Sequence, residues 1–230
     1  MKKRNIVYIP TIHHCLEKRD ILENTLSKKT VDQYFRDTNK FWKEIDDYIK
    51  KINVKIDKIF WEGWRGNEKE ISTDRKNLGK ITDKLTDDDL LQKMLESTAK
   101  MDKISNIVLD LIKKGAVLEE TESNELINEH KKIRDDLINF PKNLDKNNNI
   151  AIEHSKKLNE NNFVLIQKRD RYIAKQINYN LLTGETGILF IGRAHNVLSY
   201  LSDDIEIITD SNISDMGEKI INKYFKYKST

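Results

Sequence analysis

The feature that most constrains this chain is an uninterrupted apolar run near its C-terminus. Residues 187–192 read Gly-Ile-Leu-Phe-Ile-Gly, so four large apolar side chains follow one another between two glycines. A strand with one face in water alternates apolar and polar residues, whereas a strand that is buried on both faces is apolar throughout. The run therefore predicts a central strand of a parallel sheet that helices cover on both sides.

Three other segments have the composition of strands, and helical patterns lie between them. The strand-like segments are residues 5–12, 54–61 and 205–208, which are rich in β-branched and aromatic side chains. Apolar residues recur at helical spacing in 30–52, 163–182 and 216–227. This order predicts a single α/β domain over residues 1–230.

The middle of the chain has a different pattern. Between residues 68 and 149, charged side chains are dense among spaced Leu, Ile and Met, and there is almost no strand signal. We expect an inserted helical subregion over 68–149, between the two halves of the sheet, which is placed to act as a lid. Its charged faces are interpreted as solvated helix surface, and His130 and His154 as surface residues.

Composition excludes several classes of protein. One cysteine cannot form an intramolecular disulfide framework, which excludes a stapled secreted scaffold. The 41 Lys and Arg nearly balance the 38 Asp and Glu, so the net charge gives no sign of a nucleic-acid partner. No window approaches the roughly 18 consecutive apolar residues of a membrane-spanning helix. We expect a soluble, cytoplasmic protein without a membrane or nucleic-acid partner, and a homo-oligomer is compatible with the sequence.

Polar side chains follow three of the predicted strands. The first strand leads into His13 and His14, the second ends at Glu62, and the third leads into Arg193 and His195. Ligands of open α/β sheets bind beyond the carboxyl ends of the strands. Two imidazoles and a carboxylate at that edge suit either a divalent metal with an open position or a metal-free acid/base set.

Two stretches of the C-terminal half resemble a known family. Residues 169–177 read Arg-Asp-Arg-Tyr-Ile-Ala-Lys-Gln-Ile, and 187–195 are an apolar strand that ends in Gly-Arg-Ala-His. This is similar to the TraB/TIKI pattern Arg-Asn/Asp-x-x-Met-Ala-x-x-Ile, a strand, and then Gly-x-x-His. The family's N-terminal Gly-Thr-x-His corresponds to residues 10–13, with proline in place of the glycine, and its strand-closing Glu corresponds to Glu62. The marks occur in the family's order, and the erythromycin esterase-like, ChaN-like and GumN-like proteins belong to the same superfamily.

The resemblance implies a fold, a site and a set of cofactors. The fold would be an α/β core with a mixed central sheet flanked by helices. Some members resemble metal-dependent peptidases and would take Mn, Co or Zn, others resemble metal-independent esterases, and ChaN-like relatives bind haem. The catalytic residues implied here are His13, Glu62, Arg169 and His195, and a metal would be held by His13, Glu62 and His195. Residues expected to bind substrate are His14, Trp64, Arg65 and Arg193, and His14 is an alternative to His13 as the working imidazole.

Two functions follow as hypotheses. The first is a hydrolase of the TraB/TIKI type, in which two histidines and a glutamate at strand ends activate water to cleave a peptide or a small ester. The second is a non-catalytic ligand-binding or signalling protein that uses the same pocket for a metabolite, a peptide or haem.

Overall fold

A computed structural model describes most of the chain. The described residues are 3–12, 19–23, 26–66, 89, 92–93, 95–96, 103–139 and 149–225. The candidates His13 and His14 lie outside the described residues, as does most of the segment from 67 to 102.

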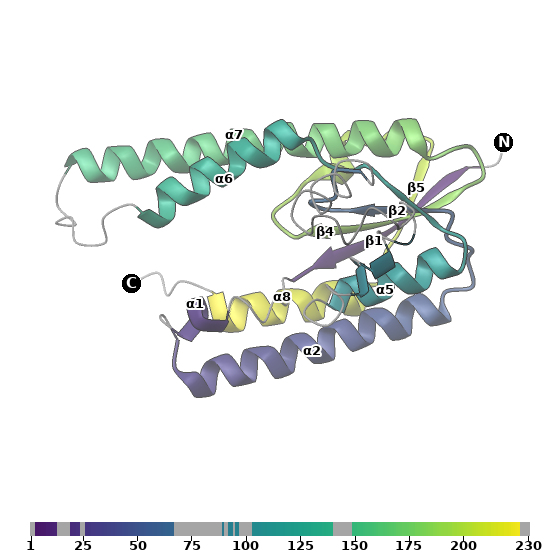
Figure 1. The fold of residues 1–230 in the computed structure, drawn as a ribbon, viewed down its shortest axis with the longest axis horizontal. Coiled ribbons are helices and arrows are strands. Elements are labelled where there is room, and N and C mark those ends of the chain that lie inside the picture. The colour runs from purple at the N-terminus through teal and green to yellow at the C-terminus, as the bar shows by residue number, and fades with distance from the viewer. Residues whose placement is uncertain are drawn as a thin grey trace.

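The described strands form one five-stranded sheet (Figure 1). Its order is β3-β2-β4-β1-β5, and all the described pairings are parallel. The strands are β1 (Arg4–Thr11), β2 (Lys58–Trp61), β3 (Val117–Glu119), β4 (Thr186–Gly192) and β5 (Ile205–Ile208). The α/β class with a helix-flanked central sheet is confirmed, and the pairings are parallel where the resemblance implied a mixed sheet.

β4 lies at the centre of the sheet because its side chains can be buried on both faces. Its residues alternate between two apolar clusters: Ile188 and Phe190 belong to one, and Leu189 and Ile191 to the other. All four side chains have no exposed surface. The uninterrupted apolar run therefore reflects burial on both sides, as the sequence predicts.

Helices cover each face of the sheet (Figure 1). One face packs against α2 (Lys28–Lys51), α5 (Lys103–Lys113) and α8 (Ser211–Phe225), and the short α1 (Arg19–Glu23) contacts α2. The other face packs against the C-terminal half of α7 (Asn149–Asn180) and the 3-10 helix η3 (Val197–Tyr200). α6 (Asn124–Asn139) lies beside α7.

α7 is one continuous helix that begins at Asn149, well before the 163–182 range in which the sequence shows helical spacing. Its 32 residues give a length of about 48 Å at 1.5 Å per residue. Ile173, Ala174 and Ile177 pack on the sheet, and Figure 1 shows the N-terminal half extending beyond the sheet together with α6. Among the described residues, no helix is both long and apolar enough to cross a membrane.

β3 is the strand that the sequence pattern did not predict. It has three residues, which is too short for an alternating pattern to be visible, and it pairs with β2 at the edge of the sheet. The described part of the expected helical subregion 68–149 therefore adds a strand to the sheet, and its helix α5 adds buried residues to the core.

The packing of β4 can be tested at Gly187. A Cβ atom placed there would lie 2.8 Å from Ile6 Cδ1 and 3.0 Å from Phe60 Cε2, and both side chains are fully buried. We expect Gly187→Ala to lower the free energy of unfolding by about 1–3 kcal/mol through overpacking, measured by urea denaturation.

Gly217→Ala in α8 is the matched control. A Cβ atom there would have 3.4 Å neighbours, which is ordinary contact, and alanine in a helix is favoured over glycine by about 0.5–1 kcal/mol. Equal destabilisation by the two substitutions would contradict the packing described for β4.

Candidate functional site

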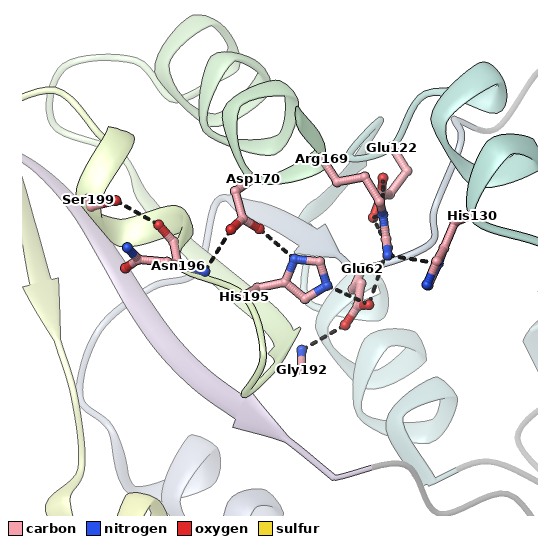
Figure 2. Close-up of polar contacts among 9 residues, drawn as sticks. All are labelled: Glu62, Glu122, His130, Arg169, Asp170, Gly192, His195, Asn196 and Ser199. Carbon is pink, nitrogen blue, oxygen red and sulfur yellow. Dashed lines mark hydrogen bonds and ion pairs between the residues drawn. The ribbon is translucent and has the colours of Figure 1, made fainter. Parts of the chain in front are cut away.

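His195 is held between two carboxylates beyond the end of β4 (Figure 2). Its Nδ1 lies 2.5 Å from Asp170 Oδ1, and its Nε2 lies 3.1 Å from Glu62 Oε1. The second oxygen of Asp170 accepts a hydrogen bond from the backbone N–H of Asn196 at 2.9 Å. The imidazole is thus fixed at both nitrogens, and each nitrogen faces an acceptor.

Glu62 reaches His195 because β2 and β4 are neighbours in the sheet. It follows directly after β2, and its backbone N–H donates to the Phe190 carbonyl at 2.9 Å. Its Oε2 accepts the Gly192 N–H at 2.7 Å, and a Cβ atom on Gly192 would lie 3.0 Å from that oxygen. Glycine at 192 therefore permits the close approach of the carboxylate to the end of β4.

The neighbours of His195 and Glu62 shift both pKa values. Burial alone would lower the pKa of His195, but its hydrogen bonds to Asp170 and Glu62 and the charge of Glu62 raise it from 6.5 to about 9. Burial alone would raise the pKa of Glu62, but the hydrogen bond and charge of His195, the charge of Arg169 and the Gly192 N–H lower it below its ordinary value. At neutral pH the site therefore holds an imidazolium beside a carboxylate.

Arg169 links the loops after β2 and β3 to α6 (Figure 2). Its guanidinium donates to Glu122 from Nε at 3.1 Å and also from NH2, and NH2 donates to Glu62 Oε1 at 3.2 Å. Its NH1 lies 3.1 Å from His130 Nδ1. Because a guanidinium can only donate, that nitrogen of His130 is the acceptor. The sequence analysis expected Arg169 to be a catalytic residue, and the structure shows its charge already paired with two carboxylates.

Glu122 and His130 are site residues that the sequence reasoning missed. Glu122 follows β3 and is fully buried, and its backbone N–H donates to the Trp64 carbonyl at 2.9 Å. Burial raises its pKa, although the hydrogen bonds and charge of Arg169 oppose the shift. The sequence does contain a signal for Glu122: the apolar residues 116–118 are followed by an acidic run. An apolar segment followed by a glutamate is the same pattern that indicated Glu62. His130 gave no such signal, because only the packing of α6 on α7 brings it to Arg169.

A cavity of about 560 Å³ lies beside this cluster at the carboxyl ends of the strands. Glu62, Arg169 and His195 line it, together with His130 from α6. Much of the remaining lining is apolar and comes from the helices of the other layer, namely Leu22, Tyr34, Ile221 and Phe225. A volume between about 300 and 1,000 Å³ is typical of small-molecule sites.

The residues expected to bind substrate are placed in different ways. Arg193 lines the cavity, donates to the Ser214 carbonyl at 2.8 Å and pairs with Glu218 at 3.7 Å. Trp64 does not line this cavity: it is buried in the core, where its ring stacks on Trp61 at 5.9 Å between centroids. The expected contact of Trp64 with substrate stays a prediction, and in the described structure its ring packs in the core.

Arg65 also lies away from the cavity lining. Its NH1 donates to Asn124 Oδ1 at 3.0 Å, which fastens the loop after β2 to the start of α6. The expected contact of Arg65 with substrate stays a prediction.

The described donors alone do not form a site for the divalent metal that the resemblance allows, and His13, the third ligand of the expected set, lies outside the described residues. Within the described residues, no group of three or more His, Cys, Asp or Glu side chains is arranged to hold a metal ion. Both nitrogens of His195 already contact carboxylate oxygens, so a cation at either nitrogen would have to displace Asp170 or Glu62 from that contact. The Arg169 guanidinium also lies 3.2 Å from Glu62 Oε1, where its charge opposes a second cation.

Comparisons with protein-family models, with curated proteins and with solved structures find no match to this chain.

The raised pKa of His195 predicts a pH-dependent stability. A group whose pKa is higher in the folded state stabilises the protein fully below its unfolded pKa, and this stabilisation is lost as the pH rises through the folded pKa. For His195 the window runs from 6.5 to about 9, and the loss is about 3 kcal/mol. We expect the free energy of unfolding, measured in urea, to fall across this window.

His195→Gln is the comparison variant for this measurement, because glutamine does not titrate. Its free energy of unfolding should change less between pH 6.5 and pH 9 than that of the unaltered protein. Parallel curves for the two proteins would show that His195 is not the group responsible.

The ion pair of Arg169 and Glu122 predicts strong coupling between the two residues. Arg169→Met leaves the fully buried Glu122 without its cation, and breaking a buried pair from one side costs about 3–5 kcal/mol. Adding Glu122→Gln to Arg169→Met should recover part of this loss in urea denaturation, because no buried charge is then left unpaired. Additive effects of the two substitutions would contradict the pairing.

Proposed function

We propose that this chain is a hydrolase of the TraB/TIKI type that cleaves a peptide or a small ester by acid/base catalysis at Glu62 and His195. The observation that carries the proposal is the position of His195, fixed between Asp170 and Glu62 on the lining of a cavity. A carboxylate–imidazole–carboxylate arrangement holds one mobile proton at a defined place, which is what hydrolysis needs.

The proposed reaction moves protons between Glu62 and His195. Water adds to the carbonyl carbon and one of its protons passes to Glu62, while the leaving oxygen or nitrogen takes the Nε2 proton of His195 as its bond to carbon breaks. Once His195 is neutral, its charge and its hydrogen bond no longer lower the pKa of Glu62, whereas the charge of Arg169 and the Gly192 N–H still do. The proton on Glu62 then returns to Nε2, and the starting pair is restored.

The other residues of the site act through this pair. Asp170 is a positioning residue, since its two oxygens hold the imidazole and the Asn196 N–H. Arg169 is a second positioning residue that holds the Glu62 carboxylate from the side of α7. His13, with His14 as its alternative, is the second histidine of the proposal, and it follows β1 in the sequence.

One observation favours the alternative of a non-catalytic ligand-binding protein. Aliphatic and aromatic side chains from α1, α2 and α8 form much of the cavity lining, which is typical of sites that hold an apolar ligand. Such a protein would bind a metabolite, a peptide or haem and would show no turnover.

Substitutions at the pair test for catalysis. We expect Glu62→Gln and His195→Gln each to lower kcat by about 10²–10⁴ against a small p-nitrophenyl ester, because each removes one partner of the proton transfer. Glu206→Gln is the control, since Glu206 lies on the exposed surface and pairs with Lys3. In the unaltered protein, kcat should decrease as the pH rises through about 9, where His195 loses its proton.

Turnover that survives both substitutions at the level of the control would contradict the proposal. Stoichiometric binding of an apolar ligand or of haem, with no ester or peptide hydrolysis, would instead favour the alternative.

A further inference from the structure

The charges around the cavity indicate which substrates it can take. Three carboxyl groups, Glu62, Glu122 and Asp170, face two cations, Arg169 and His195. Arg193, which also lines the cavity, is paired with Glu218. Among the described residues that line the cavity, each Arg, and His195, therefore already has a carboxylate partner. An anionic ligand would therefore have to displace a carboxylate that already neutralises one of these cations, which an uncharged ligand need not do.

The part of the cavity lining that comes from α1, α2 and α8 is apolar. Tyr34 and Phe225 meet edge to face with ring centroids 5.4 Å apart, and Leu22 and Ile221 extend the same surface. Phe225 is 41% exposed, so part of its ring surface is still open to be covered by an apolar group of a ligand. Burial also raises the pKa of Tyr34 to about 12, so this surface stays uncharged over the working range of pH.

From these two features we infer that the cavity takes an uncharged ester or amide whose acyl part is an apolar chain or ring. The polar carbonyl lies toward Glu62 and His195, and the apolar group lies against Leu22, Tyr34 and Phe225. This substrate class rests on the proposed hydrolase function for the reaction, but the preference for uncharged apolar ligands does not require turnover.

A binding experiment tests the ligand class without catalysis. The fluorescent probe is N-phenyl-1-naphthylamine, which is uncharged and apolar, and the competitors are octanamide and octanoate, which share a chain and differ in charge. We expect octanamide to displace the probe at a concentration at least tenfold lower than octanoate at pH 7. Equal or better displacement by octanoate would overturn the inference.

Hydrolysis of p-nitrophenyl acetate, butyrate and hexanoate tests the same class through turnover. We expect kcat/KM to rise about fourfold for each added methylene, the ratio that corresponds to burial of one such group. Phe225→Ala should flatten this dependence on chain length. Phe163→Ala is the matched control, because Phe163 is 62% exposed and does not line the cavity.

The two experiments separate the failure of the inference from the failure of the proposed function. Preference for octanamide with no ester hydrolysis would reject the hydrolase and support the ligand class. Hydrolysis that depends on Glu62 and His195 but not on chain length, with octanoate binding as well as octanamide, would support the hydrolase and reject the ligand class.

Discussion

The ion pairs of Arg169 are the interaction on which the rest of the site depends. Glu62 follows β2 and Glu122 follows β3. Arg169 lies on α7, the helix that covers one face of the sheet. A single guanidinium compensates both carboxylates. Taking either carboxylate out of water would be costly without this cation. The arrangement allows Glu62 to stay ionised beside His195 even though both side chains are largely buried.

The sheet brings these groups to one place by a simple geometric rule. Because the described strands are parallel, the residues that follow β2, β3 and β4 all lie at the same edge. α7 completes the site from one side, and the same turn of that helix supplies Arg169 and Asp170. Arg169 holds the glutamates in place, and Asp170 holds the imidazole of His195.

The parts of the structure that the sequence predicted are those with a strong local signal. The apolar run of β4 and the polar residues at strand ends led to Glu62 and His195, and the motif around residue 170 led to Arg169. β3 was missed because a three-residue strand has no periodicity, and Glu122 was missed with it. The contact of His130 with Arg169 depends on the packing of α6 against α7. The buried position of Trp64 depends on its place in a core cluster built from elements distant in the sequence. Neither can be inferred from neighbours in the sequence.

The contacts of Glu62 also have a consequence for how the molecule folds. Glu62 is separated from Arg169 by 107 positions in the sequence and from His195 by 133. Such contacts form only after long loops have closed, which makes them late and slow steps in folding. No fragment that lacks either β2 or the turn after β4 contains the pair. A spectroscopic signal of the contact between Glu62 and His195 would therefore report that β2 and β4 have paired, and not merely that the helices have formed.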